Sequence, residues 1–116
     1  KIPSAKITEL DLVEECAKSG KNILFSSGMS TLEEVDAAVD AVAKHTDKFV
    51  LFHTNSSYPA KPEELNLRTI QTLRNRYGCL IGYSGHESNL EPSVIAATLG
   101  ACVIERHITV DHGLWG

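Results

Sequence analysis

Four short apolar runs, each next to a stretch with helical periodicity, constrain the fold of this 116-residue chain most strongly. The runs are almost continuously apolar, as expected for parallel strands that are buried on both faces. They cover residues 23–27, 49–52, 79–84 and 102–108. Apolar residues recur at helical spacing in residues 10–17, 32–42, 67–77 and 94–99. This alternation predicts an α/β fold with a parallel sheet.

Local signals place the helix ends. Ser30 and Glu33 have the spacing of a capping box, and Gly20 and Gly78 stand where helices are expected to end. The apolar face of the last helix is predicted to consist of Val94, Ile95 and Leu99.

Tight βα repetition is compatible with a (β/α)₈ TIM-type barrel or with a doubly wound sheet. No glycine-rich phosphate loop opens a helix, and this favours the barrel. We therefore expect one partial (β/α)₈ domain over residues 1–116, with four full strands and the remnant of another at residues 1–4. Because the chain begins in that remnant and stops in a loop, we expect it to be truncated at both ends.

Composition excludes several classes of function. Eleven basic and fifteen acidic residues give a net charge of −4, so there is no basic field for nucleic acid or an acidic membrane surface. No run has the length of a membrane span, and no signal peptide is evident. Three widely spaced cysteines predict buried, reduced thiols and a cytoplasmic location. They are Cys16, Cys79 and Cys102.

Two histidines close the last two apolar runs. His86 and His107 would therefore lie at the carboxyl ends of parallel strands, where such folds bind ligands. Two imidazoles without thiolates leave open coordination positions, a pattern typical of a catalytic site for Mn²⁺, Mg²⁺ or Zn²⁺. Glu105 shares a strand face with His107, so it could be a ligand or orient an imidazole. The alternative is a pair of hydrogen-bonded structural histidines.

Other polar groups are predicted at the same edge. Hydroxyls and an ammonium group there would suit a substrate that carries a phosphate and a carboxylate, although serines at βα junctions also cap helices. These groups include Lys1, Ser4, Ser26, Ser56 and Ser84. Tyr58 is either a contact at this mouth or a packed loop anchor, and His53 either faces the mouth or is a core histidine. Arg106 should point to the opposite face, toward the helices.

Six segments together resemble one family. In order and spacing they are similar to the sialic acid synthases, namely the N-acetylneuraminate synthases and the related legionaminate and pseudaminate synthases. The segments are residues 1–4, 26–31, 53–59, 65–68, 82–87 and 105–109. The resemblance implies a (β/α)₈ barrel, usually followed by an antifreeze-like domain in a swapped homodimer. This chain would run from the fourth barrel strand to just past the eighth.

The resemblance also implies a reaction and its residues. Family members condense phosphoenolpyruvate with an N-acyl hexosamine, with C–O cleavage and phosphate release, and typically use Mn²⁺ as a Lewis acid. His86 and His107 match the metal ligands, and Glu105 matches an acidic residue beside the metal. Tyr58 matches a tyrosine that contacts the sugar. The positions that hold phosphoenolpyruvate correspond to Lys1, Ser4, Ser26, Ser84 and, where some members use asparagine, Ser56.

Two departures leave the acceptor open. Lys6 stands where some bacterial members carry a glutamate that contacts the sugar, and Thr54 where cysteine is common. The acceptor is then N-acetylmannosamine, a related N-acyl hexosamine or its phosphate, and a legionaminate- or pseudaminate-type synthase is the near alternative. We expect the isolated chain to be inactive, because it lacks the family's early-strand glutamate and lysine and its second domain.

Two readings outside this family stay open. One is a non-catalytic binding module on a degenerate barrel half. The other is a different metal-dependent keto-acid aldolase, and Lys1 at a strand end keeps a Schiff base open for it.

Overall fold

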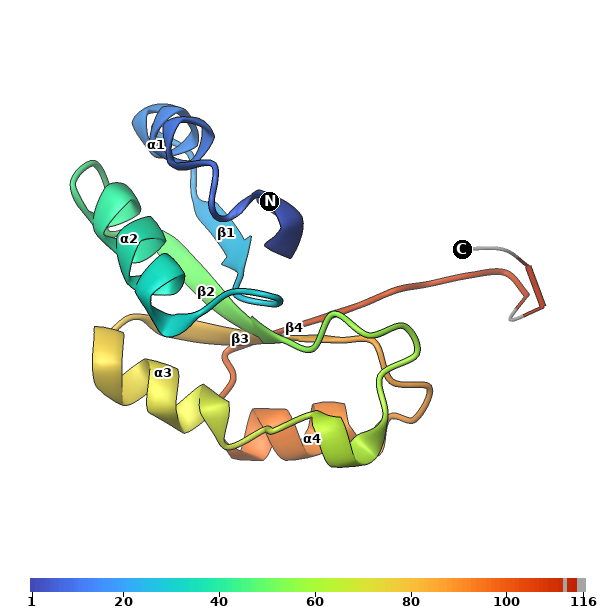
Figure 1. Ribbon diagram of the computed structural model, residues 1–116. Coiled ribbons are helices and arrows are strands. Elements are labelled where there is room, and N and C mark those ends of the chain that lie inside the picture. Colours follow the sequence, from blue (N-terminus) through green and yellow to red (C-terminus); the bar gives the residue numbers. More distant parts are fainter. Residues whose placement is uncertain (112, 115–116) are drawn as a thin grey trace.

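A four-stranded parallel sheet organises the molecule, in a computed structural model that describes residues 1–111 and 113–114 (Figure 1). The strands lie in chain order: β1 (Ile23–Ser26), β2 (Phe49–Thr54), β3 (Leu80–Gly85) and β4 (Val103–Arg106). Ile2 adds an isolated parallel bridge to Phe25, as expected for the remnant of another strand. Four parallel strands in sequential order form a half-barrel, and the predicted fold class is confirmed at that level.

The main hydrophobic core lies on one face of this sheet. The strand residues of this core all point to the same face, as their register shows: Phe25 pairs with Leu51, and Leu51 pairs with Ile81. Helices from the βα repeats pack on the same face, which is the arrangement of a barrel wall and not of a doubly wound sheet (Figure 1). These helices are α1 (Leu10–Lys18), α2 (Leu32–Ala43), α3 (Thr69–Tyr77) and α4 (Glu91–Thr98).

The other sheet face has its own tight contact. Phe52 is 1% exposed, and a Cβ on Gly82 of the neighbouring strand would lie 2.7 Å from its ring. Glycine is therefore required at position 82 for the ring to lie flat against the backbone. The Lys1 ammonium lies over this buried ring.

The capping box of α2 differs by one residue from the prediction. Thr31 is the N-cap, its hydroxyl accepts from the Glu34 N–H, and the Glu34 carboxylate accepts from the Thr31 N–H at 2.8 Å. Ser30 instead donates from its hydroxyl to the Gly28 carbonyl at 3.4 Å. Both pairs have the required spacing, so only the path of the preceding loop selects between them. The predicted C-cap of α3 is confirmed, because Gly78 has a left-handed φ of 62°.

The predicted apolar face of α4 is wrong as the buried face at Val94 and Ile95, and its third residue, Leu99, is half-buried. Val94 and Ile95 are 66% and 49% exposed, whereas Pro92 and Ala96 are the buried residues of this helix. A small side chain at Ala96 lets the helix lie close to the sheet. The thiol prediction holds only in part: Cys16 and Cys79 are half-buried, Cys102 is exposed, and all three are free.

An Arg–Asp–Tyr cluster fastens α2 to α3. Arg76 donates to both carboxylate oxygens of Asp36, from Nε at 2.7 Å and from Nη2 at 2.5 Å, and the Tyr77 hydroxyl donates to Asp36 at 2.7 Å. The hydrogen bonds from Arg76 and Tyr77 lower the pKa of Asp36 to about 2. Burial and the neighbouring Asp36 carboxylate raise the pKa of Tyr77 to about 12. The cluster is far from the strand ends described below, which makes it a useful control.

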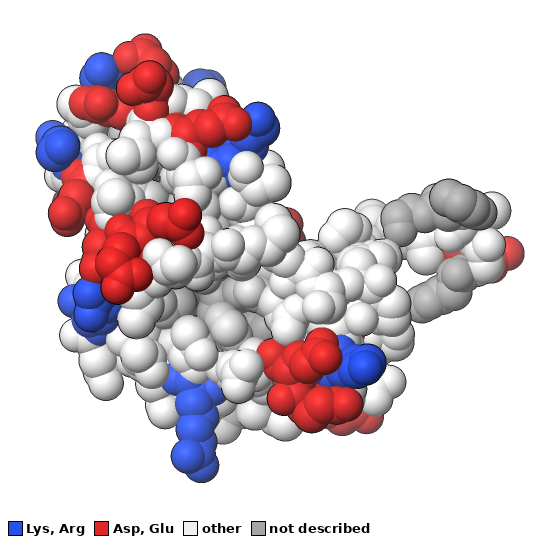
Figure 2. Space-filling model, viewed as in Figure 1, with Lys and Arg blue, Asp and Glu red and all other residues white. Residues whose placement is uncertain are grey.

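Surface charge follows the composition. On the face shown in Figure 2, blue and red side chains lie beside one another over the helices. In the described part of the chain, no helix is long and apolar enough to cross a membrane.

Candidate metal and substrate site

The two histidines lie side by side. His86 follows β3 directly and His107 follows β4 directly, and their ring centres are 5.2 Å apart. Tyr58, from the loop after β2, meets both rings edge-on, with ring-centre distances of 5.5 Å to His86 and 5.0 Å to His107. The predicted histidine pair and Tyr58 therefore form one aromatic cluster, and Tyr58 reaches the mouth.

A backbone contact sets the orientation of His86. Its Nδ1 lies 2.8 Å from the Asn55 carbonyl oxygen, which can only accept a hydrogen bond. Nδ1 therefore carries the hydrogen, and the lone pair of Nε2 is available as a ligand. This is the usual arrangement for a metal-binding histidine, whose other ring nitrogen is held by a carbonyl or a carboxylate. The backbone is also held, because the Ala60 N–H donates to the His86 carbonyl at 3.1 Å.

Lys1 and Glu105 form an ion pair across the half-barrel, although 104 positions separate them in sequence. The Lys1 ammonium also lies 4.5 Å from the centre of the Phe52 ring. The side chains of Lys1 and Glu105 are 27% and 44% exposed, so this pair contributes at most about 1 kcal/mol to stability. Its importance lies in placing an ammonium and a carboxylate next to Ser84, the register partner of Glu105.

The hydroxyl groups gather around the loop after β1. Ser4 Oγ accepts from the Gly28 N–H at 3.1 Å, and a Cβ on Gly28 would lie 2.8 Å from that oxygen and 3.2 Å from the Thr54 carbonyl. The hydroxyl of Ser56 is also among the nearest atoms to this position. Ser26 and Ser84 are buried at the ends of their strands. Sequence reasoning did not single out Gly28, although it lies inside one of the family-like segments.

Thr54 carries an unusual hydroxyl. The residue is 7% exposed, and its Oγ1 is buried without a hydrogen-bond partner in the part of the chain that the structure describes. Buried polar groups are normally paired, so an orphan at a strand end fits a site that is completed by a ligand.

Two cavities open at this edge. One, of about 420 Å³, is lined by the histidine pair and by nine more residues, including Tyr58, Glu87, Ser88, Arg106 and Thr109. The other, of about 480 Å³, is lined by Met29, His53, Thr54, Asn55, Ser56, Ser57, Glu64 and Asn66.

The donor set fits a divalent metal with an open coordination shell. Within residues 1–111 and 113–114, no group of three His, Cys, Asp or Glu side chains is arranged to hold an ion. His86 and His107 are the neighbouring imidazoles of the described chain that would hold such an ion.

Two remaining histidine and arginine predictions are resolved. His53 is buried and also lines the second cavity: it is 8% exposed, its Nε2–H donates to the Leu65 carbonyl at 2.7 Å, and burial lowers its pKa. Arg106 points toward α4, as predicted, and donates to Ser93 at 3.0 Å. Its main partner, the buried carboxylate of Glu87, was missed because a glutamate after a strand reads as a solvated loop residue.

Comparison with known proteins identifies the family. The sequence matches the NeuB family over residues 1–116. It is 39% identical to the N,N'-diacetyllegionaminic acid synthase of Campylobacter jejuni over 119 residues, which span 100% of this chain and 36% of that protein. It is 37% identical to the N-acetylneuraminate-9-phosphate synthase of Homo sapiens over 112 residues, which span 96% of this chain and 31% of that protein.

A solved structure agrees. The N-acetylneuraminic acid synthetase of Leptospira borgpetersenii serovar Hardjo-bovis, crystallised with citrate, superimposes with a TM-score of 0.91 at 39% identity. The match covers 95% of this chain and 39% of that chain. This chain thus spans about a third of the length of the relatives that it matches (31% and 36% for the two synthases). The chain belongs to the NeuB family of sugar-acid synthases.

Proposed function

We propose that the protein containing this chain condenses phosphoenolpyruvate with N-acetylmannosamine, or with a related N-acyl hexosamine or its phosphate. The product is a nine-carbon 2-keto sugar acid, and phosphate is released. The observation that carries the proposal is the imidazole pair, with ring centres 5.2 Å apart and the His86 Nδ1–H donated to a carbonyl. Membership of the NeuB family supports it.

The chemistry joins two carbon atoms. C3 of phosphoenolpyruvate attacks the aldehyde carbon of the acceptor, water adds at C2, and the C–O bond to phosphate breaks. A divalent cation, Mn²⁺ or Mg²⁺, held by His86 and His107 would polarise the aldehyde carbonyl. The negative charges of phosphoenolpyruvate are bound by side chains of this chain.

The anionic substrate needs hydrogen-bond donors and a positive charge. In the proposal Lys1 supplies the positive charge, and phosphoenolpyruvate competes with Glu105 for its ammonium group. Hydroxyl donors come from the loop around Gly28 and from the ends of the neighbouring strands. They are Ser4, Ser26, Ser56 and Ser84.

The acceptor sugar is assigned to the side of the aromatic cluster. Tyr58 is 58% exposed and touches both imidazoles, so its ring can contact a sugar that approaches the metal ligands. Glu105 lies on β4 two residues before His107, and we assign its carboxylate to orienting groups beside the metal. Lys6 pairs with Glu9 at 2.5 Å and stands where some family members carry a sugar-binding glutamate, so the identity of the acceptor sugar is left to the assay below.

The larger assembly is part of the same proposal. This chain would supply the fourth to eighth strands of a (β/α)₈ barrel, in a cytoplasmic homodimer. The half-barrel with its sequential strand order supports that placement.

A coupled assay tests the proposal. Phosphate release from phosphoenolpyruvate and N-acetylmannosamine is measured with full-length protein during Mn²⁺ titration, for wild type, His86→Ala and His107→Ala. His45→Ala is the matched control, because His45 contacts Glu14 at 2.9 Å after the end of α2. We expect release to need Mn²⁺ and both strand-end histidines, but not His45. Wild-type activity in either His86→Ala or His107→Ala would refute the metal assignment.

The acceptor is tested in the same assay. The relative from Campylobacter jejuni is named for a diacetylated product, so a doubly N-acetylated hexose is the second acceptor to compare. Turnover with that sugar alone assigns a legionaminate-type synthase. Phosphate release with neither sugar, in a protein that binds Mn²⁺, directs the search to phosphorylated acceptors.

A further inference from the structure

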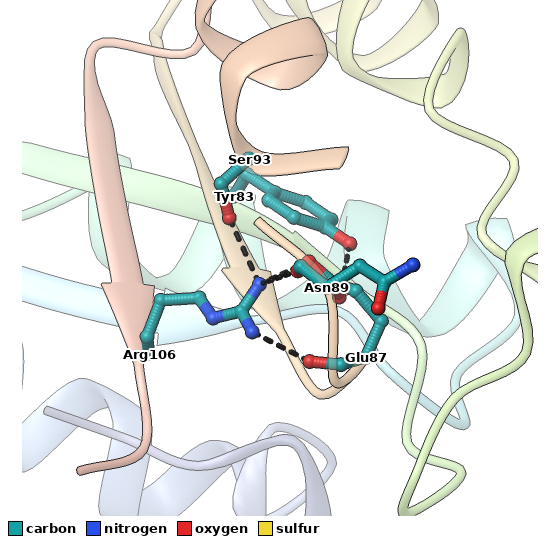
Figure 3. A network of polar contacts seen from close by, with 5 residues as sticks. All are labelled: Tyr83, Glu87, Asn89, Ser93 and Arg106. Carbon is teal, nitrogen blue, oxygen red and sulfur yellow. Dashed lines mark hydrogen bonds and ion pairs between the residues drawn. The ribbon is translucent and has the colours of Figure 1, made fainter. Parts of the chain in front are cut away.

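A buried polar network joins the two residues that neighbour the histidines in sequence, Glu87 and Arg106 (Figure 3). The side chain of Glu87 is 2% exposed, and its carboxylate accepts from Arg106 and, at 2.8 Å, from the Tyr83 hydroxyl. Arg106 also donates to the Asn89 carbonyl at 2.9 Å, to Ser93 Oγ at 3.0 Å and to the Glu87 carbonyl at 2.5 Å. One guanidinium therefore joins β4, the loop after β3 and the first turn of α4.

A carboxylate buried to this extent is unfavourable unless it is paired and hydrogen-bonded. Here both oxygens are used, one by a guanidinium and one by a phenol. Bidentate and charge-assisted hydrogen bonds of arginine are also directional, so they restrict geometry more than a lysine contact does. The network is thus a rigid connection, and removing either end leaves a buried charge.

The position of the network in the chain is what links it to the site. Glu87 immediately follows His86, and Arg106 immediately precedes His107. The last register pair between β3 and β4 joins Gly85 to Arg106, so the ladder ends one residue before each histidine. Beyond that point the ion pair continues the connection between the two strands. A Cβ on Gly85 would lie 2.8 Å from both Glu87 carboxylate oxygens, which shows how closely the side chain folds back on the strand end.

We propose that the Arg106–Glu87 pair sets the separation of the two imidazoles, with Arg106 and Glu87 acting as positioning residues and not as ligands. This inference rests on the proposed function, because it concerns the same pair of metal ligands. The tethered geometry lowers the cost of bringing His86 and His107 to one ion. Loosening the tether should weaken metal binding before it unfolds the protein.

The chain contains its own control for this idea. The Arg76–Asp36–Tyr77 cluster has the same three kinds of side chain, but it joins α2 to α3. Arg106→Lys and Arg76→Lys make the same chemical change in the two clusters. The Arg76 cluster is more exposed, with side chains at 46% and 34% against 23% and 2% in the Arg106–Glu87 pair, so the urea midpoint of each variant is measured as well. An effect on the imidazole pair should appear only in the first variant and at Mn²⁺ concentrations where that variant is still folded.

The experiment measures Mn²⁺ binding to full-length protein without substrates, from the electron paramagnetic resonance signal of free Mn²⁺. We expect Arg106→Lys to raise the Kd at least tenfold and Tyr83→Phe, a milder change, to raise it about threefold. Arg76→Lys should stay within twofold of wild type. Steady-state kinetics should show that excess Mn²⁺ restores much of the kcat of Arg106→Lys.

The outcomes separate this inference from the function on which it rests. If wild type binds Mn²⁺ through His86 and both Arg106→Lys and Tyr83→Phe bind it equally well, the inference is overturned alone. If Arg76→Lys weakens binding as much as Arg106→Lys, the effect is one of stability, and the inference is again overturned. If wild type binds no Mn²⁺, the proposed metal site and this inference fail together.

Discussion

Replacing Thr54 with valine should stabilise the protein, although it removes a polar group from the candidate site. Thr54 ends β2, it is 7% exposed, and its Oγ1 is buried without a partner in the described part of the chain. An unpaired buried hydroxyl costs about 1–3 kcal/mol of desolvation, which valine does not incur. Because valine keeps the branched shape, we expect Thr54→Val to raise the free energy of unfolding by about 1 kcal/mol.

Urea unfolding of the full-length protein, without ligands, measures this change. Thr54→Ser is the control, since it keeps the hydroxyl and loses one buried methyl group. We expect the serine variant to lose about 1 kcal/mol. The two substitutions should therefore shift the unfolding midpoint in opposite directions. A valine variant that is no more stable than wild type would refute the argument.

The same substitution should weaken substrate binding. Thr54 lines the same cavity as Ser56, and it pairs in register with Ser84. If the orphan hydroxyl binds an oxygen of phosphoenolpyruvate, Thr54→Val should raise its Kd about tenfold, which corresponds to about 1.4 kcal/mol. Calorimetric titration checks this value. If Thr54→Val is more stable but binds phosphoenolpyruvate as tightly as wild type, the hydroxyl lowers stability and does not contribute to substrate binding.

Three further predictions concern single positions. Gly28→Ala places a Cβ 2.8 Å from Ser4 Oγ, so it should raise the KM for phosphoenolpyruvate and lower stability by about 1–3 kcal/mol; unchanged kinetics would contradict the close approach. Burial lowers the pKa of His53 below 6.5, so the unfolded chain binds the extra proton. Stability should be complete above that pH and fall as pH drops through it, and His53→Gln should flatten this part of a pH series of urea midpoints. Leu51→Ala, at a core position that is 0% exposed, should cost about 3–5 kcal/mol in the same unfolding assay, and a loss below about 1 kcal/mol would contradict its core position.

Local patterns in the sequence were sufficient for the order and type of the elements. Continuous apolar runs and helical stripes are set by residues within a few positions of one another, so the parallel sheet, the C-cap at Gly78 and the strand end before His86 could be predicted. The last strand, predicted to run to residue 108, ends at Arg106. The capping box of α2 was misplaced by one residue, because two overlapping pairs satisfy the same local rule.

Other features depend on contacts between distant parts of the chain. Lys1 and Glu105 meet only because the sheet curves into a half-barrel. Glu87 is buried only because Arg106, on the next strand, reaches behind the strand ends to neutralise it.

The face that α4 buries was likewise decided by packing. The positions of the apolar residues in α4 did not indicate which of its faces is buried. Close approach to the sheet buries the small Ala96 and leaves the larger Val94 and Ile95 exposed. Periodicity thus determined which elements form and where their polar ends lie. The tertiary structure decided which charges are paired and which faces are buried, because desolvation and close packing depend on neighbours that the local sequence does not specify.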